Sequence, residues 1–331
     1  MENYCINEPC YDRMGYRRAG RSGILLPEVS LGFWHNFGAD ADYDICKAIV
    51  HTAFDSGVTY MDLANNYGPP AGSGEETFGR IFADSLRSHR DELIIATKAG
   101  HDMWPGPYGE WGSRKNLIAS LDQSLRRMRI DYVDIFYSHR PDPRTPLEET
   151  LQTLIDIVRQ GKALYVGISK YPPEMARQAY DYLEAQHVHC LLYQGKYNLL
   201  TREHEAAILP QAAASGVGYV AFSPLAQGLL TNRYLHGIPE GSRMTKSVFL
   251  NSDVLTPTLL AKLDRLNTFA SERGQSLAQM ALAWNLRSPE VTSVIVGASS
   301  VAQLQDSLKA RENTTFTADE LTAIDAILHS V

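Results

Sequence analysis

A strand, a helix and a second strand are indicated by LIIAT (residues 93–97), NLIASLDQSLRRM (116–128) and YVDIFY (132–137). The two outer segments are short and rich in β-branched and aromatic residues, which is typical of buried strands. In the middle segment, large apolar residues recur every three or four positions and so share one face of a helix: Leu117, Leu121, Leu125 and Met128. Because apolar strands joined by helices form parallel sheets, we expect a parallel sheet covered by helices.

The same unit recurs outward in both directions. The expected strands are Val29–Phe33, Val58–Leu63, Leu93–Thr97, Tyr132–Tyr137, Ala163–Ile168, Cys190–Tyr193, Gly218–Phe222 and Ser293–Val296, and a further helix is expected at Pro146–Val158. A doubly wound sheet commonly has about six strands, whereas eight strand–helix units close into a barrel. The sequence therefore predicts an α/β fold, a (β/α)8 TIM barrel.

The chain shows no Pro/Gly/Ser-rich linker, so we expect one domain over residues 1–331. Residues 1–14 are expected to be a flexible tail. The segment Tyr16–Pro27 is expected to form a β-hairpin that caps the barrel floor. The longest interruption, Leu229–Pro257, follows the seventh strand and is interpreted as a functional loop.

The composition, 44% hydrophobic and 21% charged, is typical of a soluble globular protein. The net charge of −7 and the lack of a basic run argue against nucleic-acid binding. No apolar stretch approaches the roughly 20 residues of a membrane span, and the N-terminus has no apolar signal region. The four cysteines lack disulfide or zinc spacing. We therefore expect a cytoplasmic protein.

Two local patterns suggest binding sites but are better explained by structure. GSGEET (72–77) resembles a phosphate loop, yet it lacks a third glycine and a lysine, and Glu75 and Glu76 would repel a phosphate. Acidic residues at a helix N-terminus explain it better. His187 and His189 could share one face of an extended segment, but no third ligand is near them. No metal site is expected.

Four polar residues stand at the carboxyl ends of consecutive strands: Asp62 and, just beyond it, Tyr67, then Lys98 and His139. Catalytic residues of such barrels lie at these strand ends. One ionisable residue there could be an ordinary solvated loop residue. Four that face one cavity are costly unless they pair or perform chemistry, so they are candidate catalytic residues.

Several motifs resemble those of the aldo-keto reductases over essentially the whole chain. They are MDLANNYG (61–68), IIATKAG (94–100), VDIFYSHR (133–140), VGIS (166–169), SPLAQGLL (223–230) and VIVGASSVAQL (294–304). WHNFG (34–38), NNYGPP (65–70) and MWPGPYG (103–109) look most like the bacterial L-glyceraldehyde 3-phosphate reductase group, which is related to the β subunits of voltage-gated potassium channels.

This resemblance and the residue chemistry imply the same four roles. Hydride transfer to a carbonyl leaves an oxyanion that needs a proton. We expect Tyr67 to donate it, Lys98 to lower the pKa of Tyr67 toward neutrality, and Asp62 to hold Lys98. His139 would orient the substrate carbonyl. The expected activity is NADPH-dependent reduction of small aldehydes, such as glyceraldehyde 3-phosphate or methylglyoxal.

A redox-sensing regulatory subunit is the alternative function. The channel β subunits resemble this chain but carry Asn where a reductase carries His. His139 therefore favours a reductase.

The resemblance also implies a set of cofactor contacts. The nicotinamide would contact Ser169 and Gln194, with Tyr193 as a weaker member, and the pyrophosphate Ser223, Pro224, Leu225 and Gly228. A phosphate would contact Arg233 and Arg243, and the adenosine Gly297, Ser299, Gln303, Asp306 and Ser307. Trp34 and Asp62 are further expected cofactor contacts. The two arginines could equally be ordinary surface charges. Arg233 stands where relatives usually have Lys, and Ser307 where they usually have Asn.

The expected substrate residues are Trp34, Tyr67, Trp104, Tyr108, His139 and Arg140. Aromatic walls alone would suit a large apolar carbonyl, but the stiff loop Pro105–Gly109 would narrow the mouth. Arg140 could point inward and favour a short anionic substrate, or it could pair with Asp142 or Glu148 on the outer rim. The resemblance also implies a homo-oligomer, a tetramer or larger.

Overall fold

Eight parallel strands close into a barrel in this computed structural model, which describes residue 4 and residues 8–235, 237–238 and 252–330. The strands are β3 (Val29–Gly32), β4 (Tyr60–Asp62), β5 (Ile94–Ala99), β6 (Val133–Ser138), β7 (Ala163–Ser169), β8 (Cys190–Lys196), β9 (Gly218–Phe222) and β10 (Val291–Val296). They follow one another around the barrel in chain order, and β10 closes it against β3. Each expected strand is present, so the predicted TIM barrel is confirmed.

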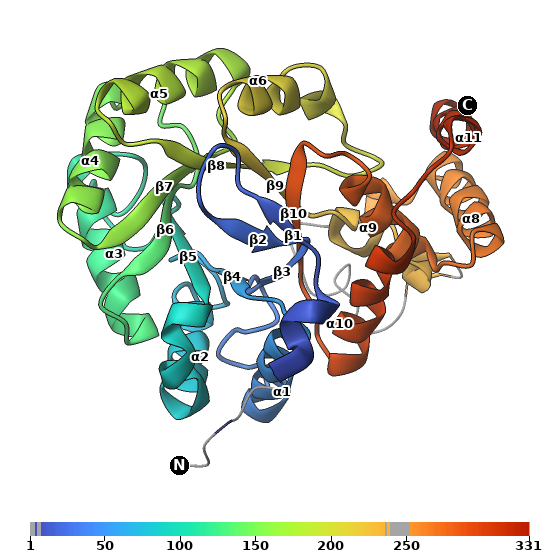
Figure 1. The fold of residues 1–331 in the computed structure, drawn as a ribbon, viewed down its shortest axis with the longest axis horizontal. Coiled ribbons are helices and arrows are strands. Elements are labelled where there is room, and N and C mark those ends of the chain that lie inside the picture. Colours follow the sequence, from blue (N-terminus) through green and yellow to red (C-terminus); the bar gives the residue numbers. More distant parts are fainter. Residues whose placement is uncertain (1–3, 5–7, 236, 239–251, 331) are drawn as a thin grey trace.

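Helices surround the barrel in Figure 1: α1 (Tyr43–Asp55), α2 (Ser73–Ile81), α3 (Arg114–Met128), α4 (Leu147–Arg159), α5 (Pro173–Ala185), α6 (Ile208–Ala214), α9 (Leu277–Leu286) and α10 (Val301–Leu308). The predicted apolar stripe of α3 buries Leu117, Leu121 and Met128. At the periphery, α8 (Pro257–Glu272) lies beside α11 (Ala318–His329), where Lys262 Nζ donates to the carbonyl oxygen of Leu328 at 2.8 Å.

Short helical turns complete the described structure: Glu8–Arg13, Phe82–Leu86, Arg87–Glu92, Glu203–Glu205, Ala226–Gly228, Asn232–Tyr234, Ser252–Val254 and Lys309–Asn313. Much of the expected loop after the seventh strand, including residues 239–251, lies outside the described residues.

The expected hairpin is confirmed: β1 (Tyr16–Arg18) pairs antiparallel with β2 (Leu25–Pro27) and lies across one end of the barrel in Figure 1. The part of the expected tail that the structure describes, residue 4 and residues 8–14, makes defined contacts. Glu8–Arg13 forms a 3-10 helix with Cys10 fully buried, and Tyr4 Oη donates to Asp55 Oδ1 at 2.6 Å. Cys10 is therefore buried, and the half-buried Tyr4 is hydrogen-bonded to α1, although the sequence suggested a polar tail.

The register of the strands determines which side chains lie at the mouth, which is the end of the barrel opposite the hairpin. Asp62 is the last residue of β4 and pairs with Ala96, while Lys98 pairs with Tyr137 on β6. Below them the barrel interior is filled by apolar and aromatic side chains: Tyr60, Ala96, Ile135, Tyr137, Leu192 and Val220. This packed floor supports the polar residues above it.

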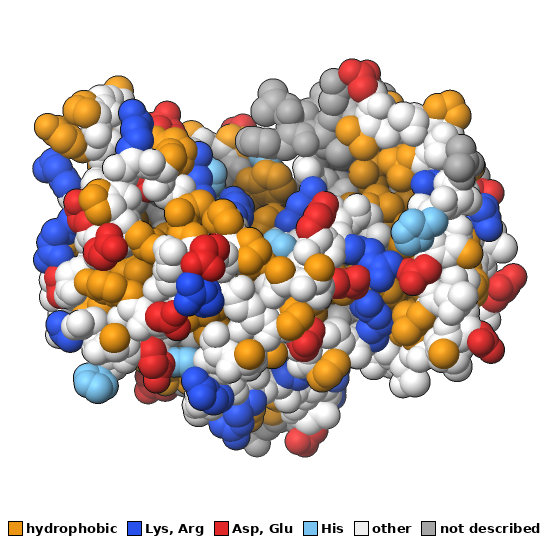
Figure 2. Space-filling model, turned by 90° about the horizontal axis from the view of Figure 1, so that it is seen from above, with side chains coloured by type: hydrophobic (Ala, Val, Ile, Leu, Met, Phe, Trp, Pro, Cys, Tyr) orange, Lys and Arg blue, Asp and Glu red, His pale blue; other side chains and the backbone are white. Residues whose placement is uncertain are grey.

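Acidic and basic side chains are interspersed over the side of the molecule shown in Figure 2. Among the described helices, none is long and apolar enough to cross a bilayer.

Candidate active site

The ammonium of Lys98 lies at the centre of the polar cluster in the barrel mouth. It is fully buried and donates to three oxygens: Asp62 Oδ2 at 2.7 Å, the Leu63 carbonyl at 2.7 Å and Tyr67 Oη at 3.2 Å. An ammonium has three hydrogens, so this arrangement uses each of them. Burial lowers the pKa of Lys98, and the Asp62 carboxylate opposes this effect. Lys98 is therefore held in one position as a cation.

Tyr67 follows β4 and reaches back over Lys98. Its hydroxyl oxygen accepts the hydrogen bond from Lys98, so the hydroxyl hydrogen can be donated elsewhere. The Lys98 ammonium is also 4.8 Å from the centroid of the phenol ring. This is the geometry of a phenol that can give a proton to a ligand in the mouth.

Asp62 is held by two further residues that the sequence analysis did not single out for this purpose. Its Oδ1 accepts from Gln194 Nε2 at 2.8 Å and from Tyr60 Oη at 3.3 Å. Tyr60 Oη is in turn 2.9 Å from Tyr137 Oη. These donors hold the Asp62 carboxylate in one position, which keeps Lys98 in place. Tyr60 and Tyr137 lie within strands, where aromatic residues are common, so the sequence did not indicate that they support Asp62.

The pKa of Tyr67 differs from the sequence-based prediction. We expected Lys98 to lower it, but burial, followed by the Asp62 charge, raises it well above the usual value. The ammonium is also closer to Asp62 (2.7 Å) than to Tyr67 (3.2 Å), and it does not offset the effect of burial. Tyr67 is therefore a neutral phenol at neutral pH, which suits a proton donor.

His139 is buried one residue beyond β6, and its ring is 6.0 Å from the Tyr67 ring in an edge-on arrangement. Burial, then the charges of Lys170 and Lys98, lower its pKa well below the usual value, so the imidazole is neutral. Its Nδ1 makes no hydrogen bond within the described residues. A neutral imidazole can donate one hydrogen bond to a carbonyl oxygen. The predicted cluster of Asp62, Tyr67, Lys98 and His139 thus comes together.

Two candidate nicotinamide residues differ in how well they fit. Ser169 ends β7 fully buried, and its Oγ has no partner within the described residues, which fits a hydrogen bond to a ligand amide. Gln194 on β8 uses its Nε2 to hold Asp62. Tyr193 Oη donates to the Tyr171 carbonyl at 2.7 Å and so serves the fold. Trp34 is half-buried just beyond β3.

The segment 223–228 after β9 is a tight turn. Ser223 has a φ of 52° and Gly228 a φ of 99°. The Gly228 N–H donates to the Leu225 carbonyl at 2.9 Å, so it holds the turn and is not available to a pyrophosphate. Pro224 is buried. Arg233 is exposed in the turn Asn232–Tyr234, and Arg243 lies outside the described residues.

The candidate adenosine residues gather at the start of α10. Ser299 Oγ donates to Gln303 Oε1 at 2.9 Å, and both residues are exposed beside the exposed Gly297. Asp306 accepts from Gln279 Nε2 at 2.7 Å, and Ser307 is buried. Gly297, Ser299 and Gln303 are therefore accessible to a ligand. Asp306 is hydrogen-bonded to Gln279 and Ser307 is buried, so these two residues serve the fold.

Arg140 pairs with a residue that the sequence analysis did not consider. Its Nε donates to the Gly100 carbonyl at 2.9 Å, its guanidinium forms an ion pair with Glu110, and it stacks 3.7 Å over Trp111. The predicted rim partners Asp142 and Glu148 are therefore wrong. Glu110 was missed because the loop after β5 returns to the mouth, which sequence spacing does not show.

The aromatic residues expected at the rim of the mouth differ in how far they are buried. Trp104 is half-buried in a loop closed by the Met103 N–H, which donates to the Gly109 carbonyl at 3.0 Å. Tyr108 is 54% exposed, with the Lys115 ammonium 5.3 Å from its ring centroid. The loop is thus compact, but Tyr108 faces solvent.

Lys170 and His101 at the mouth were also not anticipated from the sequence. Lys170 directly follows Ser169 at the end of β7, and its Nζ is 3.4 Å from His101 Nε2. The same strand-end criterion that identified Lys98 could have found it.

The two patterns set aside in the sequence are accounted for by protein contacts. Glu75 of α2 is fully buried, pairs with Arg127 at 2.8 Å and accepts from Thr97. The two ring nitrogens of His189 contact the Glu184 carboxylate (2.8 Å) and the Gly216 carbonyl (3.0 Å).

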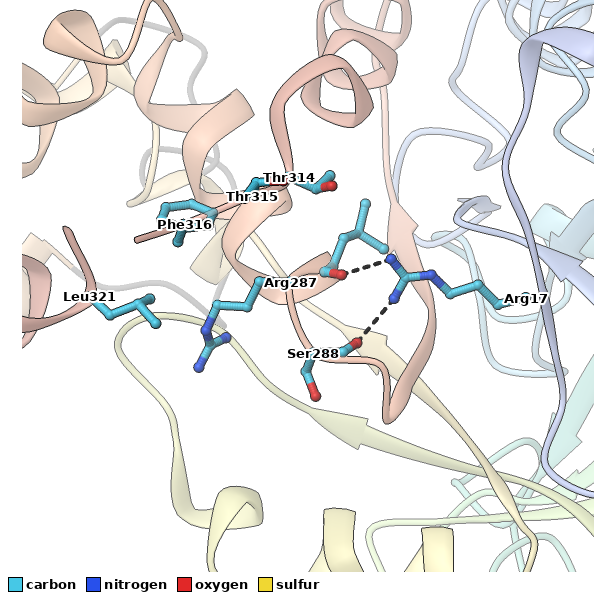
Figure 3. A pocket seen from close by; sticks show the side chains of 8 residues that line it. Arg17, Arg287, Ser288, Thr314, Thr315, Phe316 and Leu321 are labelled. Carbon is cyan, nitrogen blue, oxygen red and sulfur yellow. Dashed lines mark hydrogen bonds between the residues drawn. The ribbon is translucent and has the colours of Figure 1, made fainter. Parts of the chain in front are cut away.

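A cavity of about 550 Å³ opens between the hairpin and the segment 314–321, away from the catalytic cluster (Figure 3). The two arginines that line it are bonded to other groups of the protein. Arg17 donates to the carbonyls of Leu286 (2.7 Å) and Ser288 (3.0 Å), and Arg287 pairs with Glu205 at 3.1 Å. This cavity therefore offers no catalytic group.

Comparison with known proteins agrees with the geometry. The chain is 53% identical over 327 residues to the L-glyceraldehyde 3-phosphate reductase of Escherichia coli O157:H7, covering 97% of this chain and 94% of that protein. The protein of that name from Escherichia coli K12 is 52% identical over the same shares. A probable voltage-gated potassium channel subunit beta of Oryza sativa is 36% identical, covering 90% and 91%. Residues 28–329 match the Aldo/keto reductase family, and the chain belongs to that family.

Proposed function

We propose that this protein is an NADPH-dependent reductase that converts small aldehydes, glyceraldehyde 3-phosphate among them, to alcohols. The observation that carries the proposal is the contact between Lys98 and the hydroxyl oxygen of Tyr67, which leaves the Tyr67 hydrogen for a substrate. The relatives named L-glyceraldehyde 3-phosphate reductase support the substrate.

The chemistry assigns a step to each residue. The bound cofactor supplies a hydride to the carbonyl carbon. Tyr67 gives its proton to the carbonyl oxygen, and Lys98 stabilises the phenolate that remains. His139 donates a hydrogen bond to the same oxygen and orients it. The unpartnered Ser169 Oγ fits the carboxamide of a nicotinamide.

Preference for NADPH over NADH follows from the proposed phosphate contacts of Arg233 and Arg243. Charge-assisted hydrogen bonds to the 2′-phosphate are absent with NADH. We expect Arg243→Ala to weaken NADPH binding about tenfold or more, with NADH binding unchanged. Cofactor titrations followed by protein fluorescence measure both constants. Arg18→Ala, an exposed arginine of the hairpin, is the control. Equal weakening of both cofactors would place Arg243 elsewhere.

A short polar substrate is expected to react faster than a bulky one. The loop 103–109 is compact, and we expect it to narrow the mouth. The value of kcat/KM for glyceraldehyde 3-phosphate and for methylglyoxal should therefore exceed that for a steroid ketone by roughly tenfold or more. Steady-state oxidation of NADPH measures all three. Faster turnover of the steroid would refute the small-substrate assignment but leave the reductase chemistry intact.

The similarity to potassium channel subunits supplies the alternative, a redox-sensing regulatory subunit. If the protein oxidised NADPH only at trace rates with both glyceraldehyde 3-phosphate and methylglyoxal, this alternative would be favoured over the reductase. We also propose a single barrel domain, a cytoplasmic location and a homo-oligomer.

A further inference from the structure

Lys170 is a cation in the barrel mouth that no described carboxylate neutralises. It is exposed there, and the charges that act on it are those of Lys98 and Arg140. Both of these neighbours have carboxylate partners, Asp62 and Glu110 respectively. Among Lys98, Arg140 and Lys170, only Lys170 has no carboxylate partner within the described residues, so its ammonium can bind a negatively charged ligand.

A continuous series of rings connects Lys170 to the catalytic cluster. Its Nζ lies 3.4 Å from His101 Nε2. The His101 ring is 4.4 Å from the His139 ring, and the His139 ring is 6.0 Å from the Tyr67 ring. A ligand whose carbonyl contacts Tyr67 and His139 would therefore extend along the imidazoles toward Lys170.

His101 acts as the support for Lys170. An ammonium has hydrogens but no lone pair, so the contact requires His101 Nε2 to accept, and the ring hydrogen then resides on Nδ1. Burial, then Lys170 and Arg140, lower the pKa of His101 to about 4, which keeps the ring neutral and able to accept.

The local field disfavours an isolated cation at this position. Partial desolvation of the ammonium within the mouth, then the charges of Lys98 and Arg140, lower the pKa of Lys170 to about 8 although the residue is exposed. An anion bound beside Lys170 would reverse this effect, because an opposite charge stabilises the ammonium. The mouth therefore attracts a negatively charged substrate group.

We propose that Lys170, oriented by His101, binds the phosphate of a phosphorylated aldehyde whose carbonyl lies against Tyr67 and His139. The inference rests on the proposed reductase function and adds the residue that selects the substrate. It replaces Arg140 in the role that the sequence suggested, since the Arg140 guanidinium is occupied by Gly100, Glu110 and Trp111.

Two lysines that flank the same strand give a matched test. Lys170 follows β7 at the mouth, whereas Lys162 precedes it and pairs with Asp122 at 2.7 Å. We expect Lys170→Gln to lower kcat/KM for glyceraldehyde 3-phosphate about tenfold or more, mainly through KM, and that for glyceraldehyde by less than about twofold. Lys162→Gln should change neither, and Lys170→Arg should retain most of the preference for the phosphorylated substrate.

A binding measurement separates this inference from the function on which it rests. The NADPH-saturated protein is titrated calorimetrically with inorganic phosphate, and binding should be lost in Lys170→Gln and kept in Lys162→Gln. If the wild-type protein fails to reduce the phosphorylated aldehyde, the proposed substrate is wrong, while the titration still tests the anion site. Equal loss for both aldehydes, weaker NADPH binding in Lys170→Gln, or phosphate binding that survives this substitution would overturn the role of Lys170.

Discussion

Replacing Tyr67 with phenylalanine should reduce kcat by about 10²- to 10⁴-fold, because the carbonyl oxygen loses its proton donor in the transition state. The change removes the one hydroxyl that receives a hydrogen bond from Lys98, yet it keeps the ring that packs edge-on against His139. The proposed cofactor contacts do not involve this hydroxyl, so the Kd for NADPH should stay nearly constant. Single-turnover oxidation of NADPH, combined with a fluorescence titration of the cofactor, measures both quantities.

A second tyrosine provides the control for this experiment. Tyr193 is buried on β8, and its hydroxyl serves the fold by donating to the Tyr171 carbonyl. Tyr193→Phe should therefore affect stability more than kcat. If Tyr67→Phe kept a third or more of the wild-type kcat, another group would have to supply the proton.

Replacing Lys98 with methionine should both inactivate and destabilise the protein. The buried carboxylate of Asp62 loses its cation at 2.7 Å, and breaking a buried ion pair from one side costs about 3–5 kcal/mol. The phenolate left by proton transfer also loses its stabilising charge, so kcat should fall by about 10²-fold or more. Urea denaturation gives the free energy of unfolding, and steady-state kinetics give kcat.

The double variant Asp62→Asn, Lys98→Met separates the two effects. Removing both charges should restore part of the stability, since no unpaired charge remains buried, whereas activity should stay at the level of the single variant. Lys162→Met is the counterpart at a pair that is only partly buried, and loss of its contact with Asp122 should cost at most about 1 kcal/mol. A Lys98→Met variant with wild-type stability would show that the buried pair is not stabilising.

The sequence by itself determined the barrel and which residues form the candidate catalytic cluster. Periodicity is a local property: the apolar run at Val133–Ser138 and the leucine stripe of α3 each specify their element without reference to distant residues. Once eight such units are counted, closure of the barrel brings the strand ends together. The positions of Asp62, Lys98 and His139 at one mouth then follow from chain order alone.

Only the tertiary structure decided how those groups act on one another. Burial of the phenol, followed by the charge of Asp62, raises the pKa of Tyr67. Neither this burial nor the distances from Lys98 to Asp62 (2.7 Å) and to Tyr67 (3.2 Å) can be read from residue order. The ion pair of Arg140 with Glu110 depends on the path of a loop, and the support of Asp62 by Gln194 joins residues on β4 and β8. Interaction energies depend on distance and burial in three dimensions, whereas sequence patterns report only which residue types recur along the chain.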